Sequence, residues 1–244
     1  MKSLDKVFDI MELVAGREGE SVSPGTAAKI LNLNPATCVR FMKYLCKRGY
    51  LEQISRREGY VTGPAGLTFT DRQSKYSKII EASEEPVKKL ADQLNNYMNI
   101  SILYNSVRYL LYMYSSHTRK TSGARRIRFD YDVATSRLLL SACDAETRNE
   151  IIDLAGMPGA SWDNINDRET LLKALEKTRK SACISFPDPR TGQWIIGGLI
   201  LAEGFPAAAI GFGINGDDPS EALKLTRKTV KEIEKKLNRK EIVF

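Results

Sequence analysis

Apolar residues near the start of the chain recur at the spacing of an amphipathic helix. They are Leu4, Val7, Phe8, Met11, Val14 and Ala15. Two shorter helices are predicted next, because a capping residue stands immediately before a proline at Ser23-Pro24 and again at Asn34-Pro35. The third helix is predicted to end at about Arg48, since a glycine follows it.

The pattern changes to that of a β-hairpin directly after the third helix. Two β-prone runs, 50–54 and 60–62, enclose the polar turn 55–59, which ends in a glycine. Three helices and a hairpin in this order are typical of a winged helix-turn-helix. Residues 65–83 are polar and compatible with a helix, so we expect a linker helix there. The predicted domains are 1–64, a linker at 65–83, and 84–244.

The rest of the chain alternates between helical and strand-like patterns. Helices are predicted at 84–95, 134–141, 144–155, 168–179 and 220–238. Strands are predicted at 98–104, 108–115, 182–186, 193–201 and 207–214, with a basic loop at 116–128. Because short turns join the strands and helices flank them, we expect an antiparallel sheet in an α+β domain.

Charge and composition restrict the possible functions. The chain has a formal net charge of +7, which favours a polyanionic partner. No run approaches the ~18 apolar residues of a membrane helix, so we expect a cytoplasmic protein without membrane contact. The four cysteines have no metal-ligand spacing, and His117 is the one histidine of the sequence. We therefore expect neither a metal site nor a cofactor.

The third predicted helix has two chemically different faces. One face contains Cys38, Phe41, Met42 and Leu45 and is expected to pack on the other helices. The opposite face contains Ala36, Arg40, Lys43 and Lys47, that is, three cations and no acid. A solvated helix surface usually mixes charges of both signs, so this face favours contact with a nucleic acid over a merely solvated role.

The surrounding segment supports the same interpretation. Between residues 29 and 57, seven lysines and arginines stand against one acid, a net charge of +6. Basic residues at the hairpin tip suit a wing, and small residues at the start of the third helix can approach base edges. The predicted DNA contacts are Ala36, Thr37, Arg40, Lys43, Tyr44, Lys47, Arg56 and Arg57.

The N-terminal segments resemble the DNA-binding domain of the IclR family of transcriptional regulators. They are SLDKVFDIMELVA, TAAKILNLNPATCVRFMKYLCKRGYLEQ and GYVTGPAGL. The resemblance implies that Thr37 and Arg40 contact DNA and that Gly49-Tyr50 begins the wing. The sequence departs from the family pattern at Ala36 and Val39, where serine and histidine are frequent. These departures affect which operator sequence the protein recognises, and not whether it binds DNA.

The second half resembles the effector-binding domain of the same family, a GAF-like α+β fold. The matching segments are ATSRLLLSACDAETRNEII and GQWIIGGLILAEGFPAAAIGFGI. Ser136 replaces the glycine of the family pattern, and the histidine and proline usual before this segment are absent. The resemblance implies a homodimer or tetramer on double-stranded DNA, paired through Leu4–Ala15 and the linker, with a small-molecule effector.

Candidate effector contacts come from several segments. Gly198, Gly211 and Gly213 lie in predicted strands, where glycine marks either space beneath a ligand or close sheet packing. Arg125 and Arg126 belong to a loop that borders the effector pocket in the family. Guanidinium groups bind carboxylates, so an anionic effector is one hypothesis for this loop. A loop that is solvated or contacts another subunit is the interpretation that a run of surface cations favours more. The resemblance adds Ala134 and Cys183, and Cys183 also suits a buried apolar position.

The sequence therefore predicts a sequence-specific transcriptional regulator controlled by a small effector, and a repressor in the commoner mode of the family. A first alternative is a DNA-binding protein whose C-terminal domain only oligomerises and binds no effector. A second alternative is an enzyme in which His117 activates Cys143 or Cys183. No motif supports that pairing, so we predict no catalytic residues.

Overall fold

The computed structural model of the chain describes residues 2–17, 19–55, 57–69 and 73–239. It forms two compact units, Met1–Arg72 and Gln73–Phe244. Within the described ranges, every helix is too short or too polar to span a bilayer. The same ranges contain no cluster of three or more potential metal-ligating side chains.

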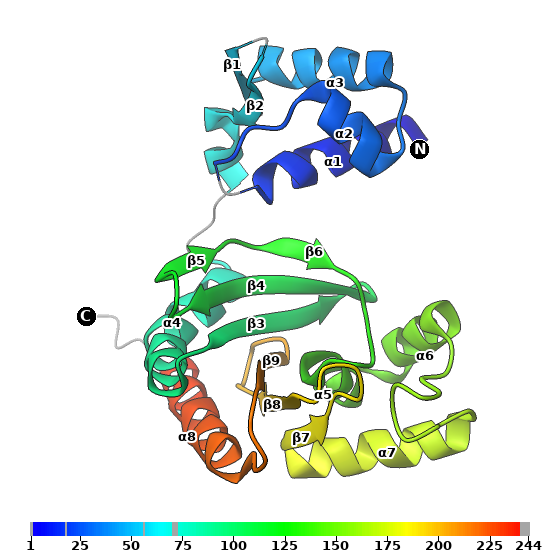
Figure 1. Cartoon of the computed structure of the whole chain (residues 1–244), viewed down its shortest axis with the longest axis vertical. Helices are drawn as coiled ribbons and strands as arrows, with labels where there is room; N and C mark the ends of the chain where they lie inside the picture. Colours follow the sequence, from blue (N-terminus) through cyan, green and yellow to red (C-terminus); the bar gives the residue numbers. More distant parts are fainter. Residues whose placement is uncertain (1, 18, 56, 70–72, 240–244) are drawn as a thin grey trace. The chain divides into compact units, whose positions relative to one another are not determined.

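The first unit consists of three helices, a two-stranded antiparallel hairpin and a short 3-10 helix (Figure 1). Its elements are α1 Lys2–Ala15, α2 Pro24–Leu31, α3 Pro35–Lys47, β1 Leu51–Ser55, β2 Gly59–Thr62 and η1 Pro64–Phe69. Both predicted helix caps form. The Ser23 hydroxyl accepts the Thr26 N–H at 3.1 Å, and the Asn34 side-chain oxygen accepts the Ala36 N–H at 2.9 Å. The predicted winged helix-turn-helix layout is confirmed.

One apolar core joins the helices and the hairpin of this unit. Its buried residues are Ile10, Val14, Val22, Ala27, Ala28, Cys38, Met42, Leu45, Leu51 and Tyr60. The hairpin is also tied to the segment before α2, because the backbones of Val22 and Tyr60 exchange hydrogen bonds of 2.8 and 3.0 Å. Gly59 permits this approach: its φ is +104°, and a Cβ there would lie 2.6 Å from the Val22 carbonyl oxygen.

The second unit is a seven-stranded antiparallel sheet with helices on both faces. Its helices are α4 Lys75–Leu94, α5 Ala134–Ala142, α6 Ala145–Ala155, α7 Arg168–Ser181 and α8 Ser220–Leu237. Its strands are β3 Tyr97–Tyr104, β4 Val107–Ser115, β5 Lys120–Ser122, β6 Arg125–Ile127, β7 Cys183–Pro187, β8 Trp194–Ile200 and β9 Ala208–Ile214. The strand order is β5-β4-β3-β9-β8-β7, and β6 also pairs with β4. The predicted α+β class is confirmed.

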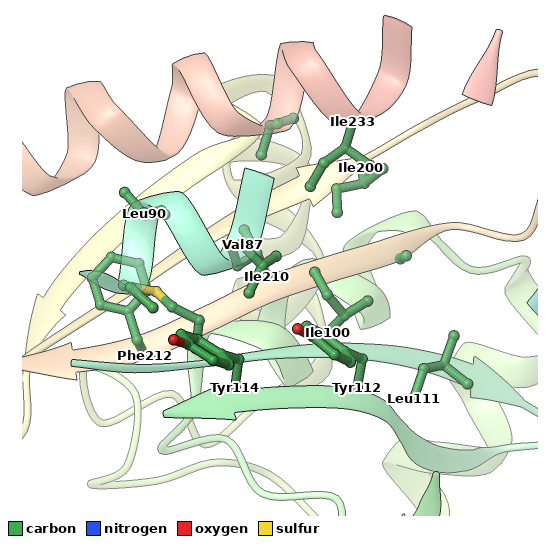
Figure 2. Close-up of a cluster of buried hydrophobic side chains, with 14 of the residues drawn as sticks. Val87, Leu90, Ile100, Leu111, Tyr112, Tyr114, Ile200, Ile210, Phe212 and Ile233 are labelled. Carbon is green, nitrogen blue, oxygen red and sulfur yellow. The ribbon is translucent and has the colours of Figure 1, made fainter. Parts of the chain in front are cut away.

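The two faces of the sheet have separate cores. Helices α4 and α8 cover one face, where Figure 2 shows Val87, Ile210 and Ile233 among the buried side chains. Helix α5 covers the other face, with a smaller cluster that contains Leu138 and Leu199. Side chains alternate between the two faces along a strand. Consecutive residues within β8, and likewise within β9, therefore face different helices.

Two predicted segments differ from the structure. Residues 65–83 and 84–95 do not form two separate helices, because α4 continues across residue 84 and packs on α8. Pro86 does not end this helix, since buried apolar residues continue on both sides of it, from Ile79 to Leu90. The predicted loop 116–128 contains the short strands β5 and β6. Their pairing with β4 is a long-range contact, which local sequence patterns do not encode.

Candidate nucleic-acid interface and candidate effector site

The exposed surface of α3 brings together most of the predicted DNA contacts. Ala36, Arg40, Lys43 and Lys47 are exposed, and Tyr44 lies among them with 55% of its surface exposed. Thr37, also predicted, is half-buried at the first turn of the same surface. Helix α3 contains no acidic residue. The buried side holds Cys38, Met42 and Leu45, so the predicted division of faces is confirmed.

Arg40 has a restrained side chain whose donors remain available. Its guanidinium carbon lies 5.2 Å from the centroid of the Phe41 ring, a cation–π contact. Among the described residues, none accepts a hydrogen bond from Arg40. Its guanidinium can therefore donate two parallel hydrogen bonds to a guanine edge or a phosphate.

The wing turn carries the other predicted contacts. Arg57 is exposed in the turn between β1 and β2, whereas Arg56 lies outside the described residues. The turn is held by two hydrogen bonds, from the Ser21 hydroxyl to the Glu58 carbonyl at 2.6 Å and from the Glu58 N–H to the Ser55 hydroxyl at 3.0 Å. Arg57 is therefore next to a residue, Glu58, whose backbone is held by two hydrogen bonds.

The predicted effector residues do not form one site in this structure. Cys183 and Gly198 are direct cross-strand partners on the face covered by α8, whereas Ala134 belongs to the α5 cluster. Arg125 and Arg126 lie in β6, where they pair with Leu110 and Tyr109 of β4. The set is therefore divided between two faces and one edge of the sheet.

Close helix packing accounts for Gly198 and Gly211, two of the three predicted glycines. A Cβ on Gly198 would lie 2.6 Å from a methyl group of Val230 in α8. On Gly211 it would lie 2.6 Å from a methyl group of Thr135 in α5. Gly213 instead lies beside the Gln193 side chain, whose Oε1 would be 3.1 Å from such a Cβ. The alternative of sheet packing therefore fits Gly198 and Gly211.

Cys143 and Cys183 have the environment of structural cysteines, not that of catalytic nucleophiles. Burial raises the pKa of both the Cys143 and the Cys183 thiol, which disfavours the nucleophilic thiolate. The Cys143 thiol donates to the Leu140 carbonyl at 3.3 Å. His117 is exposed, and within the described residues it is hydrogen-bonded to neither thiol. This geometry gives no support to a cysteine–histidine pair.

Two buried arginines near α5 were missed by the sequence reasoning. Arg108 of β4 is 8% exposed, and its Nη1 donates to the hydroxyls of Thr135 and Ser136 at 3.0 and 2.7 Å. Its Nε has no acceptor among the residues that the structure describes. Burial lowers its pKa to about 10. Arg137 of α5 is 5% exposed. Arg137 is the one charged residue of the run ATSRLLLSA, and this was the signal that could have found it.

Arg137 borders a cavity of about 480 Å³ between α7 and β7. Its Nε donates to the Tyr131 carbonyl at 2.7 Å and its Nη2 to the Ser161 carbonyl at 2.6 Å. Its guanidinium carbon lies 3.4 Å from the ring centroid of Phe186 and 4.6 Å from that of Trp162. The guanidinium is therefore held in a fixed position beside the cavity.

The combination of a winged helix-turn-helix and an antiparallel-sheet unit can be compared with known proteins. The sequence matches no family model and no curated protein. Solved structures, in contrast, match nearly the whole chain. An IclR homologue from Microbacterium hydrocarbonoxydans, complexed with 4-hydroxybenzoate, is 16% identical with a TM-score of 0.74, over 96% of this chain and 98% of its own.

Two further structures have the same fold. The IclR of Thermotoga maritima is 15% identical with a TM-score of 0.60, over 98% of this chain and 100% of its own. An IclR family regulator from Brucella abortus is 14% identical with a TM-score of 0.64, over 96% of this chain and 92% of its own. This chain therefore has the fold of the IclR family transcriptional regulators, and the predicted resemblance is confirmed at the level of the fold.

Proposed function

We propose that the chain is a sequence-specific DNA-binding transcriptional regulator controlled by a small molecule that binds the second unit. The observation that carries the proposal is the exposed surface of α3, with Arg40, Lys43 and Lys47 and no acid. Such a surface on the recognition helix of a winged helix-turn-helix suits the major groove. Repression is the mode we expect, and the structural matches to regulators favour this role over an enzyme.

DNA recognition by this unit calls for two copies of the chain. One helix-turn-helix reads one half-site, so two copies must bind about one helical turn apart or a multiple of it. Helix α1 offers a pairing surface, because Leu4 and Phe8 are one turn apart and are 61% and 56% exposed. Large apolar side chains that are adjacent and exposed favour a protein contact. We therefore include a homodimer in the proposal.

Control by an effector is supported by the second unit. It contains a cavity of about 480 Å³ beside a buried arginine, a size common for small-molecule sites. An effector that prefers one arrangement of the two recognition helices would shift operator affinity by its differential binding. A second unit that only oligomerises remains the alternative, and it would bind no small molecule.

The first experiment selects genomic fragments with the purified protein and compares their affinities with random duplex at one fixed salt concentration. We expect enrichment of a short inverted repeat. Equal binding to all fragments would contradict sequence-specific recognition and leave a general nucleic-acid binder.

Two variants of α3 then test the assignment of its surface. Arg40→Ala should weaken operator binding by ~1–3 kcal/mol if Arg40 contacts a base. Lys47→Ala, the matched comparison, should weaken binding to all sequences alike and reduce the slope of log K against log salt by about 1, as expected for a lost phosphate contact. Fluorescence anisotropy at several salt concentrations measures both. Wild-type operator affinity of Arg40→Ala would show that the surface is misassigned.

A further inference from the structure

We propose that the exposed surface of α8 is a second contact with double-stranded DNA, made to the phosphate backbone and independent of base sequence. The contact residues are Lys224, Lys228, Lys231 and Lys235, which we call the lysine stripe. This inference deepens the proposed function, on which it rests for the identity of the polyanion. It adds a contact by the second unit, whereas the DNA contacts described above belong to the first.

The lysine stripe lies on the side of α8 that faces away from the sheet. Its members are three or four residues apart, so at 3.6 residues per turn they fall within about 60° of one another and extend over ~16 Å of the helix. All four are exposed. The opposite side of α8 is buried, and Figure 2 shows Ile233 of this side between the helix and the sheet. Internal packing therefore occupies the apolar side of α8 and leaves the cationic side available to a partner.

The positive charge of the lysine stripe is not paired within the described part of the chain. The glutamates of α8 flank the stripe on the helical wheel, at Glu221, Glu232 and Glu234. None of the four lysines forms an ion pair with a described residue. On α4 and α7, in contrast, lysines pair with a glutamate four residues earlier, as Lys88 does with Glu84 at 2.7 Å.

This arrangement of charges opposes the stability of the helix. Lys224 and Lys228 are four residues apart, and so are Lys231 and Lys235. Like charges at this spacing destabilise a helix, whereas opposite charges stabilise it. A merely solvated surface would be more stable with an acid in each pair, as on α4 and α7. Four lysines without such an acid therefore favour an external polyanion, as on the exposed surface of α3.

The chemistry of the lysine stripe favours duplex DNA over other polyanions. The lysine ammonium is a point charge without the planar fork with which arginine reads a base edge, so it suits phosphates. The stripe contains no aromatic ring on which an unpaired base could stack, which disfavours single-stranded nucleic acid. It also contains no apolar side chain that could enter a bilayer. A duplex carries one charge per about 1.7 Å of its axis and thus presents several phosphates to this surface.

A variant without the lysine stripe tests the contact in the full-length protein. It combines Lys224→Gln, Lys228→Gln, Lys231→Gln and Lys235→Gln, which remove the charge but keep side chains that favour a helix. The probe is a long duplex of random sequence. We expect binding at low salt to weaken at least about tenfold, and the slope of log K against log salt to fall by about 2–4, since each phosphate contact contributes about 0.9. Fluorescence anisotropy measures both, and a wild-type slope overturns the proposal.

The matched control removes four exposed cations from other positions of the second unit. It combines Lys75→Gln, Lys89→Gln, Arg179→Gln and Lys180→Gln. Both variants lower the net charge by the same amount, so the control separates a local contact from the general attraction of a positive protein. We expect the control to change the slope by less than about 1. Equal losses in the two variants overturn the local contact. Circular dichroism and thermal melting establish that both variants are folded.

Chemical modification of lysines tests the same contact without any substitution. A water-soluble acetylating ester modifies exposed amines, and mass spectrometry identifies the modified residues. We expect saturating duplex to protect the lysine stripe and to leave Lys89 and Lys180, which are exposed on α4 and α7, as reactive as before. Unchanged reactivity of the lysine stripe in the presence of duplex overturns the proposal.

Sedimentation with vesicles of phosphatidylcholine and phosphatidylserine tests an anionic membrane as the partner. We expect the wild type and the variant without the lysine stripe to sediment alike. If that variant instead loses vesicle binding and keeps wild-type binding to duplex, the surface of α8 binds lipid and the proposal is wrong.

The contact of α8 and the proposed function can fail separately. Loss of the lysine stripe should weaken binding to operator and to random duplex by the same factor, so the ratio of the two affinities stays constant. Arg40→Ala should lower this ratio. If the selection of genomic fragments enriches no sequence, sequence-specific recognition fails, and the salt slope of the stripe variant still decides whether α8 contacts DNA.

Discussion

Gly197 shows how a single missing side chain sets the distance between the sheet and α5. A Cβ there would lie 2.6 Å from the Cβ of Ala134, 2.9 Å from Leu138 and 3.0 Å from the Ile210 carbonyl oxygen. The Ile210 oxygen belongs to the backbone of the neighbouring strand and cannot move aside cheaply. Along β8, Gly197 and Gly198 serve opposite faces, since Gly198 approaches α8. Two adjacent glycines thus let helices approach the sheet from both sides.

The substitution Gly197→Ala tests this close packing. We expect the added methyl group to lower the free energy of unfolding by ~1–3 kcal/mol, because α5 or the sheet must shift. Urea denaturation followed by circular dichroism measures the change. Gly123→Ala is the control, since a Cβ there meets no atom within 4 Å, and it should stay within ~0.5 kcal/mol of wild type. Equal midpoints for both variants would contradict the packing argument.

At the scale of elements, α6 and α7 begin with the same cap. Asp144 accepts the Thr147 N–H at 2.8 Å, and Asp167 accepts the Thr170 N–H at 2.9 Å. These backbone hydrogen bonds, helped by the threonine hydroxyls, lower the pKa of both carboxyls. A carboxylate at a helix start also interacts favourably with the helix dipole. The two helix starts therefore depend on ionised aspartates.

The pH dependence of stability should reflect these caps. A carboxyl whose pKa is lower in the folded state stabilises the fold above its unfolded pKa of about 3.9. That stability is lost as the pH falls through the lowered folded pKa. We therefore expect Asp167→Asn, which keeps a capping oxygen but cannot ionise, to lose less stability than wild type between pH 6 and pH 3. Urea midpoints at both pH values test this, with the exposed Asp217→Asn as control. Parallel losses in Asp167→Asn and wild type would contradict it.

The periodic elements were predictable because their signals are local. Helix α3 could be predicted from the Asn34-Pro35 start and its buried Cys38–Leu45 side, since capping and helical spacing act within one or two turns. Strands β5 and β6 could not, because their stability comes from pairing with β4. The continuous α4 was not predicted, because its first half is polar and was interpreted as a linker that ends at residue 83. Packing on α8 and the sheet joins this half to the apolar stripe of 84–95 in one helix.

At the scale of the whole molecule, one segment of the first unit is strongly basic. Residues 29–57 have a net charge of +6, and they include the recognition helix and the wing. The rest of the first unit is net acidic, so the positive charge of this unit lies on the elements that are proposed to contact DNA. Attraction to a polyanion is therefore strongest at this segment of the unit.

A dimer formed through α1 gives a prediction at this scale. Phe8→Glu places a charge on the exposed apolar surface of α1 and should weaken self-association about tenfold or more, with a parallel loss of operator affinity. Sedimentation velocity and anisotropy measure the two effects. Leu154→Glu, at a residue of α6 that is 77% exposed, is the control for adding a charge elsewhere. If Phe8→Glu still sediments as a dimer, the pairing surface lies elsewhere.

The sequence by itself determined the winged helix-turn-helix, the α+β class of the second unit and the basic surface of α3. Each of these depends on periodicity, capping or charge within a short segment. Only the tertiary structure decided that Cys183 and Ala134 lie on opposite faces of the sheet and that Arg137 borders a cavity. Those relations depend on strand order and on contacts between Arg137, Phe186 and Trp162, which are far apart along the chain. A local sequence pattern cannot predict such contacts, because only tertiary packing brings these residues together.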